Sequence, residues 1–220
     1  MKQAMMVAVA MGLVFGLVGC GPTMTAPEKA KAPEKAKAPE KAPTKTVAEK
    51  AKAPGKAKAP PADKLVIRVD CASNADYTDL AGNKWLADQE GKKWGASGGL
   101  TVTRTLSTIA GTQAPRIYLT ERYEVVSYRF DVPNGKYTVR VHCAETFPGV
   151  TAAGDRVFTI KMQGKPLFEN VDPFKDGGGF AKPVVKEAKG VAVTDGKLLI
   201  EFDWTTGNSA AINGIEVIAE

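Results

Sequence analysis

One stretch of the sequence has the spacing of a serine nucleophile. Residues 95–99 read Gly-Ala-Ser-Gly-Gly, a pattern that would make Ser97 a nucleophile with His142, the single histidine, as its base. The pattern works on a sharp turn, with a strand before the serine and a helix after it. Here two lysines precede the pattern, and Leu100-Thr101-Val102, which is typical of a strand, follows it. The sequence therefore argues against a serine hydrolase.

Carboxylates and metal ligands are the next candidates for chemistry. The acidic residues considered as a glycosidase pair are Asp155, Glu201 and Asp203. Their separation depends on the fold, so a glycoside hydrolase stays open as the third hypothesis. The softer metal-ligand candidates after residue 63 are Cys71, His142 and Cys143. Their spacing does not resemble a zinc site, so we expect no metal and no other cofactor.

Aromatic residues in the segments between strand patterns remain as candidates. They are Tyr77, Trp85, Trp94, Tyr118, Tyr123, Phe147 and Trp204. A sugar ring has an apolar C–H face and an edge of hydroxyls, so a carbohydrate site needs exposed aromatic rings beside polar groups. We expect Trp85 in the core and Trp94 and Phe147 at the surface. The sequence is equally compatible with a core or a surface position for Tyr118, Tyr123 and Trp204.

Two alternating strands between Arg122 and Phe147 must position several of these residues. In the first strand, the apolar residues on one face are Val126, Tyr128, Phe130 and Val132. In the second, they are Tyr137, Val139, Val141 and Cys143. Between the strands, Pro133-Asn134-Gly135 offers residues that tolerate positive φ in a tight turn. The pattern predicts a hairpin of two paired antiparallel strands.

The same period of two recurs through residues 64–220. Further apolar strand patterns lie at residues 65–69, 100–102, 158–162, 198–202 and 215–217. Clusters of Gly, Pro, Asn and Asp separate them, and no helical period longer than a turn or two stands out. The segment is long enough for one hydrophobic core. We expect an all-β domain at residues 64–220, a jelly-roll-like sandwich of two packed sheets.

The first 19 residues have the organisation of a secretory signal. Lys2 is followed by an uncharged, mostly apolar run of 16 residues, Ala4 to Gly19, which is shorter than a membrane span. The exit, Leu17-Val18-Gly19-Cys20, resembles a bacterial lipobox, which implies lipidation of Cys20 and an exported protein anchored in the cell envelope. Gly21, in place of aspartate, favours the outer membrane. The alternative is an ordinary cleaved signal that happens to contain a cysteine.

Residues 20–63 form a tether in this interpretation. They repeat Ala-Pro-Glu-Lys-Ala-Lys with a period of six from Ala26 and contain no aromatic residue, so they cannot bury enough apolar surface to fold. Residues 21–64 contain 11 lysines and 5 acidic residues, net +6, whereas residues 65–220 contain 18 basic and 19 acidic residues, net −1. The basic excess therefore gives no support for nucleic-acid binding by the folded domain. A lysine-rich arm could touch anionic lipid, but a solvated spacer is the simpler interpretation.

Export to an oxidising compartment would allow a disulfide between Cys71 and Cys143. Each lies on the apolar face of a strand, near its end. In an oxidising compartment they could form a disulfide, and two separately buried thiols fit the pattern equally well. The sequence leaves both alternatives open.

The order of motifs from about Val66 onward resembles the malectin and malectin-like family. The motifs are Val69-Asp70-Cys71, Tyr77-Thr78-Asp79, residues 118–123, residues 133–137, residues 142–145, Arg156-Val157-Phe158 and residues 211–216. Together they cover nearly all of residues 65–220. The resemblance implies a jelly-roll-like β-sandwich that binds carbohydrate without cleaving it, through aromatic residues in loops at one end.

Carried over by position, the resemblance implies sugar contacts for Tyr123 and Phe147. The full set of candidate carbohydrate-binding residues is Trp94, Tyr118, Tyr123, Glu145, Phe147 and Asn208. The sequence also departs from the family pattern. Pro148 stands where the family has another aromatic residue, Asn208 replaces an acidic contact, and the tyrosine expected near Gly98-Gly99 is absent, with Trp94 the nearest substitute.

These observations lead to three hypotheses of different classes. The first is a non-catalytic, lipid-anchored envelope protein that binds an oligo- or polysaccharide through its sandwich domain. The second is a protein-interaction or scaffolding module at the cell surface, and the third is the glycosidase. The sequence is silent on oligomeric state.

Overall fold

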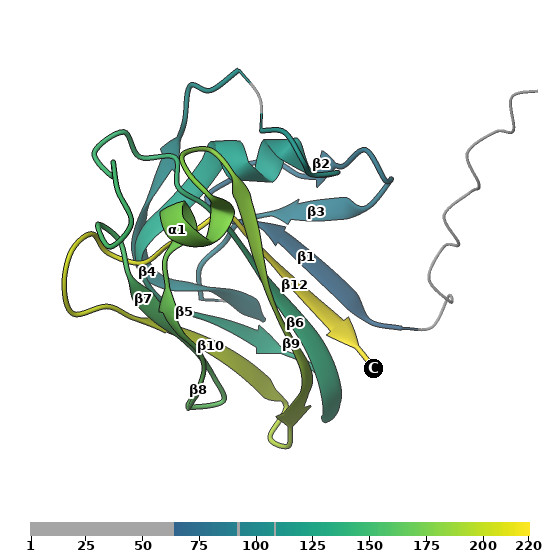
Figure 1. Ribbon diagram of the computed structural model, residues 1–220. Coiled ribbons are helices and arrows are strands. Elements are labelled where there is room, and N and C mark those ends of the chain that lie inside the picture. Colours follow the sequence, from purple (N-terminus) through teal and green to yellow (C-terminus); the bar gives the residue numbers. More distant parts are fainter. Residues whose placement is uncertain (1–63, 92, 108) are drawn as a thin grey trace, which may run out of the picture. The chain divides into compact units, whose positions relative to one another are not determined.

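The computed structural model describes residues 64–91, 93–107 and 109–220, and these form one β-sandwich domain (Figure 1). One sheet has the order β2 (Tyr77–Thr78), β3 (Lys84–Ala87), β1 (Val66–Asp70), β12 (Gly214–Ala219), β6 (Gly135–Ala144), β9 (Pro183–Val193). The other has the order β11 (Ala211–Ile212), β5 (Thr120–Asp131), β10 (Lys197–Asp203), β7 (Phe158–Met162), β8 (Lys165–Val171). β4 (Trp94–Thr103) also belongs to this sheet and pairs with β5. The expected all-β, two-sheet fold is confirmed.

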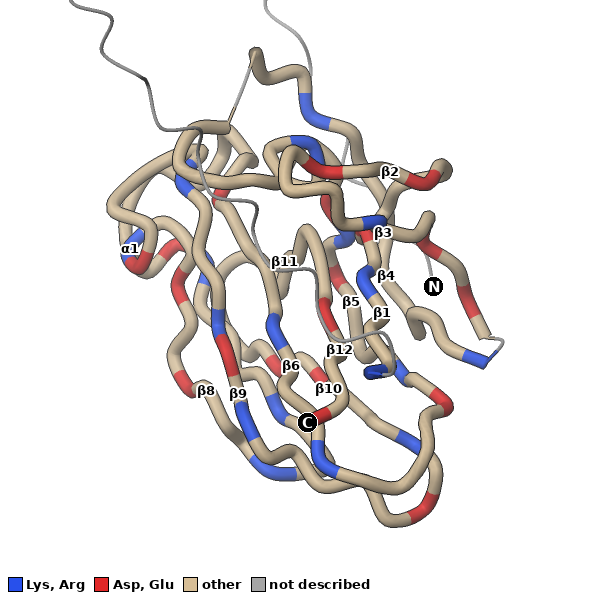
Figure 2. The backbone as a smooth tube through the Cα atoms, turned by 90° about the vertical axis from the view of Figure 1, so that its right-hand side faces the viewer, with Lys and Arg blue, Asp and Glu red and all other residues tan. Residues whose placement is uncertain are grey.

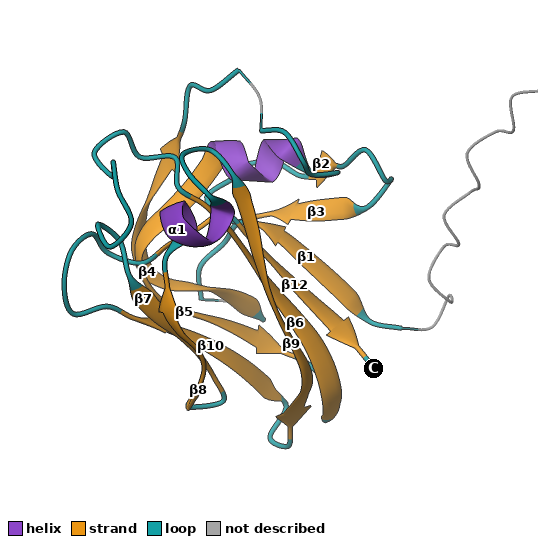
Figure 3. Cartoon of the chain, in the orientation of Figure 1, coloured by secondary structure: helices purple, strands orange, loops and turns teal. Residues whose placement is uncertain are grey.

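Helical structure in the described residues is limited to two short elements, the 3₁₀ helix η1 (Pro115–Leu119) and α1 (Pro173–Gly177) (Figure 3). Asp172 caps α1 by accepting a hydrogen bond from the Lys175 backbone N–H, and Gly178 ends it in a left-handed conformation. No helix among these residues is long and apolar enough to cross a membrane. The expected signal segment, Cys20 and the tether lie outside the described residues.

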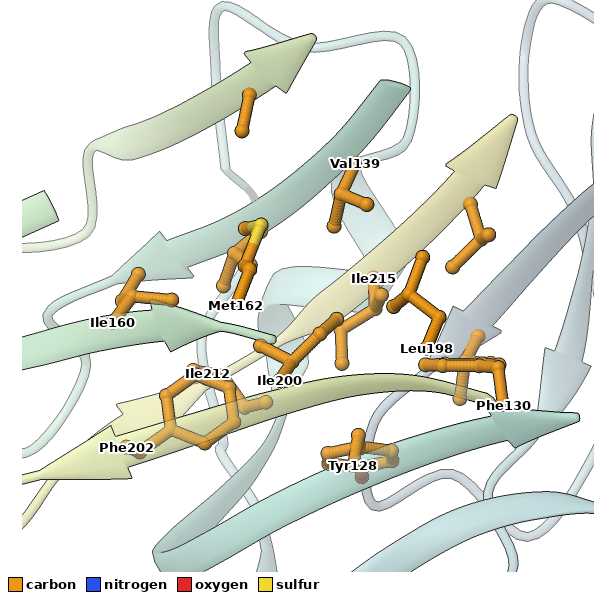
Figure 4. Close-up of a cluster of buried hydrophobic side chains, with 14 of the residues drawn as sticks. Tyr128, Phe130, Val139, Ile160, Met162, Leu198, Ile200, Phe202, Ile212 and Ile215 are labelled. Carbon is orange, nitrogen blue, oxygen red and sulfur yellow. The ribbon is translucent and has the colours of Figure 1, made fainter. Parts of the chain in front are cut away.

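The core lies between the two sheets and is built from the inward positions of their strands. Figure 4 shows Phe130 and Leu198 of one sheet and Val139 and Ile215 of the other pointing into this common layer. Along β6, the predicted inward set is buried throughout: Tyr137, Val139, Val141 and Cys143. Burial of alternate apolar side chains is the main force that holds the sheets together.

The predicted hairpin between Arg122 and Phe147 is wrong. β5 pairs with β4, β10 and β11, whereas β6 pairs with β12 and β9, so the two strands lie in opposite sheets. The turn after Val132 carries the chain across the sandwich, where Val132 donates its N–H to Gly196 and the Tyr137 hydroxyl donates to Pro133. The apolar faces of the strands therefore meet face to face instead of continuing one surface.

Val126 is a second correction within the same strand. It is 54% exposed, while its neighbour Val125 is fully buried. The register between β4 and β5 shifts after Ser97, because Gly98 pairs with Val125 and leaves Val126 as an extra residue. Glu124, two residues before Val126, has a positive φ of 56°. This β-bulge exchanges the inward and outward positions of β5 from Val125 back to the start of the strand.

Cys71 and Cys143 are free and buried. Of the two alternatives left open by the sequence, the structure has two separate thiols and not a disulfide. Burial raises the pKa of Cys143 to about 12 and raises that of Cys71 well above its usual range. Both thiols therefore stay protonated and behave as small core residues.

Charge is dispersed over the domain. Figure 2 shows Lys and Arg interspersed with Asp and Glu along the strands of the sandwich. Several opposite charges pair across neighbouring strands, as between Arg140 of β6 and Glu187 of β9, 2.6 Å apart. This pattern agrees with the near-zero net charge of residues 65–220.

Candidate functional site

An open groove of about 720 Å³ lies at one end of the second sheet. Its lining comes from the end of β4, the start of β5, the segment after β6 and the segment after β10, the yellow loop at the left of Figure 1. The lining residues are Val102, Arg104, Glu121, Tyr123, Glu124, Val126, Phe147, Arg156, Trp204, Gly207, Asn208 and Ser209. The bulge in β5 turns the Val126 side chain outward, and this residue joins the lining.

Three aromatic residues from three separate segments meet in this groove: Tyr123, Phe147 and Trp204. Phe147 is 37% exposed, and the Arg104 guanidinium carbon lies 5.3 Å from its ring centroid. Gly149 lies close to the same ring, since a Cβ at that position would be 2.5 Å from the Phe147 ring carbon Cε1. Packing by Arg104 and Gly149 therefore holds the Phe147 ring in place before any ligand arrives.

Arg104 is held by a buried carboxylate at the floor of the groove. Its Nη2 lies 3.0 Å from Oε1 of Glu121, and its Nε lies 3.4 Å from Oε2. Thr146 donates its hydroxyl to the same Oε2 at 2.6 Å. Both oxygens of Glu121 are therefore engaged, and the guanidinium plane is oriented by two contacts to one partner.

Arg156 is held in the same manner by Glu145. Nε of Arg156 donates to Oε2 of Glu145 at 2.7 Å, and Nη1 donates to the backbone carbonyl of Ser209. The other oxygen of Glu145 accepts the Phe147 N–H at 2.9 Å. Burial raises the pKa of Glu145 against the opposing effect of Arg156. Glu145 thus links one arginine and one aromatic residue of the groove from behind.

The loop after β10 is tied to the loop after β6. The Asn208 N–H and its side-chain Nδ2 both donate to the carbonyl oxygen of Asp155, each at 2.9 Å. Gly207 has a φ of +72°, and a Cβ there would lie 2.7 Å from the same oxygen. Only glycine fits this close approach in that conformation. One side of the groove is therefore a joint product of two loops distant in sequence.

Tyr123, Phe147 and Asn208 of the predicted set line the groove, and Glu145 lies directly behind it. Trp94 lies elsewhere. It pairs with Phe130 on β5, seven residues from Tyr123, which corresponds to roughly 20 Å along the strand. Its ring stacks on Phe130 with centroids 6.2 Å apart. Trp94 begins β4, whereas the groove is lined from the opposite end of this strand, by Val102.

Tyr118 is also not available to a ligand. It is 1% exposed, and its hydroxyl lies 2.9 Å from Nδ1 of His142. His142 in turn lies 3.1 Å from Glu216 and edge-on to Trp85. This histidine is therefore a buried structural residue.

The sequence prediction missed the charged residues of the groove and understated Trp204. The missed charged residues are Arg104, Glu121, Glu124 and Arg156. A lone arginine after a threonine-rich strand carries no sequence signal, and Glu121 and Arg156 stood only as parts of family-like motifs. Trp204 was recognisable as an aromatic residue just past a strand end, where loops carry binding residues.

The other chemical candidates lie outside the groove. Ser97 sits within β4, with no helix after it. Asp203 pairs with Lys161, and Asp155 accepts the N–H groups of Thr151 and Ala152 in its own turn. Within the described ranges, no three His, Cys, Asp or Glu side chains are grouped so that they could hold a metal ion.

Comparisons with known proteins agree with this architecture. The family model for the malectin domain matches residues 65–219. Receptor-like protein 4 of Arabidopsis thaliana is 39% identical over 93 residues, which are 42% of this chain and 15% of that protein. The chain therefore spans less than a fifth of this relative.

Solved structures show the same fold. The crystal structure of a Bacteroides uniformis β-glucuronidase superposes with a TM-score of 0.64 and 26% identity, over 71% of this chain and 18% of that one. The plant receptor-like kinase FER, in complex with the peptide RALF23 and LLG2, superposes with a TM-score of 0.60 over 70% of this chain and 48% of that one, and at 20% identity it shows the fold alone. Because the family model covers well over half of the sequence, the chain belongs to the malectin domain family.

Proposed function

We propose that the domain binds carbohydrate in the groove, without cleaving it. The observation that carries the proposal is the convergence of Tyr123, Phe147 and Trp204 beside polar groups in one open groove. Aromatic faces suit the apolar C–H face of a sugar ring, while Asn208 and the arginines suit its hydroxyls. An open groove of this size accommodates part of an oligo- or polysaccharide chain rather than enclosing a small molecule.

The state of the groove carboxylates supports the non-catalytic proposal. Glycoside hydrolysis uses two carboxyl groups, one of them a proton donor, on either side of the scissile bond. The groove carboxylates are Glu121 and Glu124. Both oxygens of Glu121 accept hydrogen bonds from Arg104 and Thr146, so this group is committed to structure. Glu124 alone does not make a catalytic pair.

Removal of the Phe147 ring is expected to weaken glycan binding. Phe147→Ala removes an exposed aromatic face, and affinity should fall about tenfold or more. Phe180→Ala is a matched control, since Phe180 is 38% exposed, close to the 37% of Phe147, but lies outside the groove. Calorimetric titration of the full chain with saccharides selected on a glycan array measures both. Equal affinities for the two variants would contradict the proposal, and so would an array without any binding.

A protein partner is the second candidate, favoured by the free side of β4. Leu100 on this strand is 54% exposed and lies outside the groove lining, an unusual surface for an apolar side chain at a sheet edge. Affinity capture from envelope extract, repeated with competing glycan, separates the candidates. A partner held through its glycan is released by competition, whereas a partner bound at the β4 edge stays bound.

For the location of the protein we propose export and lipid anchoring at Cys20, on the strength of the sequence pattern around that residue. Cys20→Ser removes the acceptor thiol. The variant is expected to shift from the membrane fraction to the soluble fraction, because the lipid chains supply the membrane affinity. Fractionation with mass spectrometry of the mature N-terminus tests this. An unmodified Cys20 in the wild-type protein would leave the ordinary cleaved signal as the explanation.

A further inference from the structure

Arg156 presents an unused hydrogen-bond donor to the groove. The residue is 3% exposed, and its Nε and Nη1 donate to Glu145 and to the Ser209 carbonyl. Its Nη2 has no acceptor among the residues that the structure describes. Among the described residues, the one buried side-chain nitrogen or oxygen atom without a partner is Oδ2 of Asp70, so Nη2 of Arg156 is not buried. Because Arg156 lines the groove, this nitrogen opens into it.

Arg104 has the same arrangement on the floor of the groove. Its Nε and Nη2 contact Glu121, and its Nη1 has no acceptor within the described part of the chain. The guanidinium lies over the Phe147 ring, which fixes its position at the groove surface. Two guanidinium groups from different segments therefore each turn one nitrogen, with two N–H donors, toward the ligand space.

The carboxylates behind these arginines offer few free acceptors to a ligand. Glu121 and Glu145 are each 1% exposed, and every one of their oxygens already accepts a hydrogen bond. The remaining side-chain acceptors of the groove include Oδ1 of Asn208 and the exposed carboxylate of Glu124. The inner part of the groove is thus rich in donors and poor in acceptors, which suits a ligand group that only accepts.

We propose that the sugar recognised by this groove carries a carboxylate, as a uronic acid residue does, and that Arg156 and Arg104 donate to it. This inference rests on the proposed carbohydrate binding. A guanidinium edge matches the planar carboxylate, and hydrogen bonds between charged partners are about twice as strong as neutral ones. A hydroxyl at the same place accepts fewer bonds and leaves donors unsatisfied. The carboxylates at Glu121 and Glu145 keep both arginines oriented while the site is empty.

Matched ligands test the inference on the unmodified full chain. The probes are glucuronate- and galacturonate-containing oligosaccharides, their methyl esters and their carboxyl-reduced neutral forms, with a sulfated saccharide to separate carboxylate from general anion binding. The uronate form should bind at least about tenfold more tightly than its ester or neutral form. Equal affinities for the three forms would overturn the inference and leave carbohydrate binding standing, and equal binding of the sulfated probe would also overturn it. If none of the saccharides bound, both proposals would fail.

Arginine variants test which residues recognise the carboxylate of the sugar. Arg156→Lys and Arg104→Lys keep a positive charge opposite Glu145 and Glu121 but remove the guanidinium edge, so the preference for uronate should fall about tenfold. Arg140→Lys, in an ion-pair network on the other sheet, is the matched control and should keep the preference. Glu124→Gln should increase uronate affinity by removing a like charge. Circular dichroism verifies folding, and a preference that survives both groove variants would overturn the assignment.

Discussion

Replacement of Asp88 by alanine is expected to lower the free energy of unfolding by about 3–5 kcal/mol. The Asp88 side chain is buried where the segment after β3 meets β5. Its Oδ2 accepts from the Ala72 N–H at 2.7 Å, from Nε of Arg122 at 2.8 Å and from the Tyr128 hydroxyl at 2.8 Å. Its Oδ1 accepts from the Gln89 N–H at 2.8 Å. One carboxylate thus satisfies four donors.

The expected loss is large because Arg122 is itself buried. Without Asp88, its guanidinium keeps Glu90 and the Gly98 carbonyl as acceptors but loses the buried anion beside it. A buried charge left without its partner costs far more than the pair contributes. Arg122 lies between Glu121 and Tyr123 on β5, so the loss would also loosen the start of the strand that supplies the groove.

Chemical denaturation of the wild type and the variant measures this difference. Asp203→Ala is the matched control, because Asp203 also pairs across the structure, with Lys161, but its side chain is 51% exposed. Exposed ion pairs contribute little, so this variant should lie within about 1 kcal/mol of the wild type. A similar, small loss for both variants would show that the Asp88 network does not stabilise the fold.

Replacement of Asp70 by asparagine is expected to stabilise the protein at pH 8 by about 3 kcal/mol. Asp70 is fully buried, and its Oδ2 has no hydrogen-bond partner in the described ranges of the chain. Its Oδ1 lies 2.5 Å from the Thr120 hydroxyl oxygen, which also lies 3.2 Å from the Ile117 carbonyl. If the Thr120 hydroxyl donates to Ile117, a protonated Asp70 can donate to Thr120. Asparagine offers the same donor at every pH.

The sign of the pH dependence follows from the pKa of Asp70. Burial raises it from 3.8 to about 6, against the hydrogen bond from Thr120 and the charge of Arg116. The folded protein therefore binds this proton more tightly than the unfolded chain does. The resulting stabilisation is fully present below about pH 4 and is lost as the pH rises through 6. The Asp70→Asn variant should lack this decline.

The stabilising contribution of Glu216 depends on pH in the opposite sense and sets the lower pH limit of the measurement. Burial opposes its ionisation, but His142, Arg68 and Arg140 outweigh it and lower the pKa of Glu216 from 4.5 to about 2. Its stabilisation is present above pH 4.5 and is lost as the pH falls toward 2. Denaturation between pH 4.5 and 8 therefore avoids the loss at Glu216, and the Asp70→Asn variant separates the contribution of Asp70 from that of Glu145, whose pKa burial also raises. A wild-type decline that persists unchanged in Asp70→Asn would assign it to another group.

Alternation of apolar residues predicted the buried faces well where the strands are regular. Tyr128 and Phe130 on β5 and Val139 and Val141 on β6 all point into the core, as expected. β9 was missed, because its lysines, glutamate and glycine mask a strand that forms an edge of the first sheet. A strand with only one neighbour can carry many polar residues, so its sequence signal is weak.

The structure brings only some of the predicted binding residues to one groove, because contacts between distant parts of the chain decide where each residue lies. Tyr123, Phe147 and Asn208 come together in the groove, yet Trp94 and Tyr118 do not. All five are aromatic or polar residues near strand ends, and the sequence does not show which end of the sandwich each strand end occupies. The position of Trp94 depends on the register of β4 against β5, including the bulge at Gly98.

Side-chain periodicity is a local property, so the sequence determined the class of fold, the parity of most strands and the family likeness. The pairing of strands depends on contacts between residues far apart in the chain, and here tertiary structure placed β5 and β6 in opposite sheets. The same long-range packing drew Arg104 and Arg156 to one groove over buried carboxylates. Neither arginine has a local signal, because its role comes only from neighbours that folding brings to it.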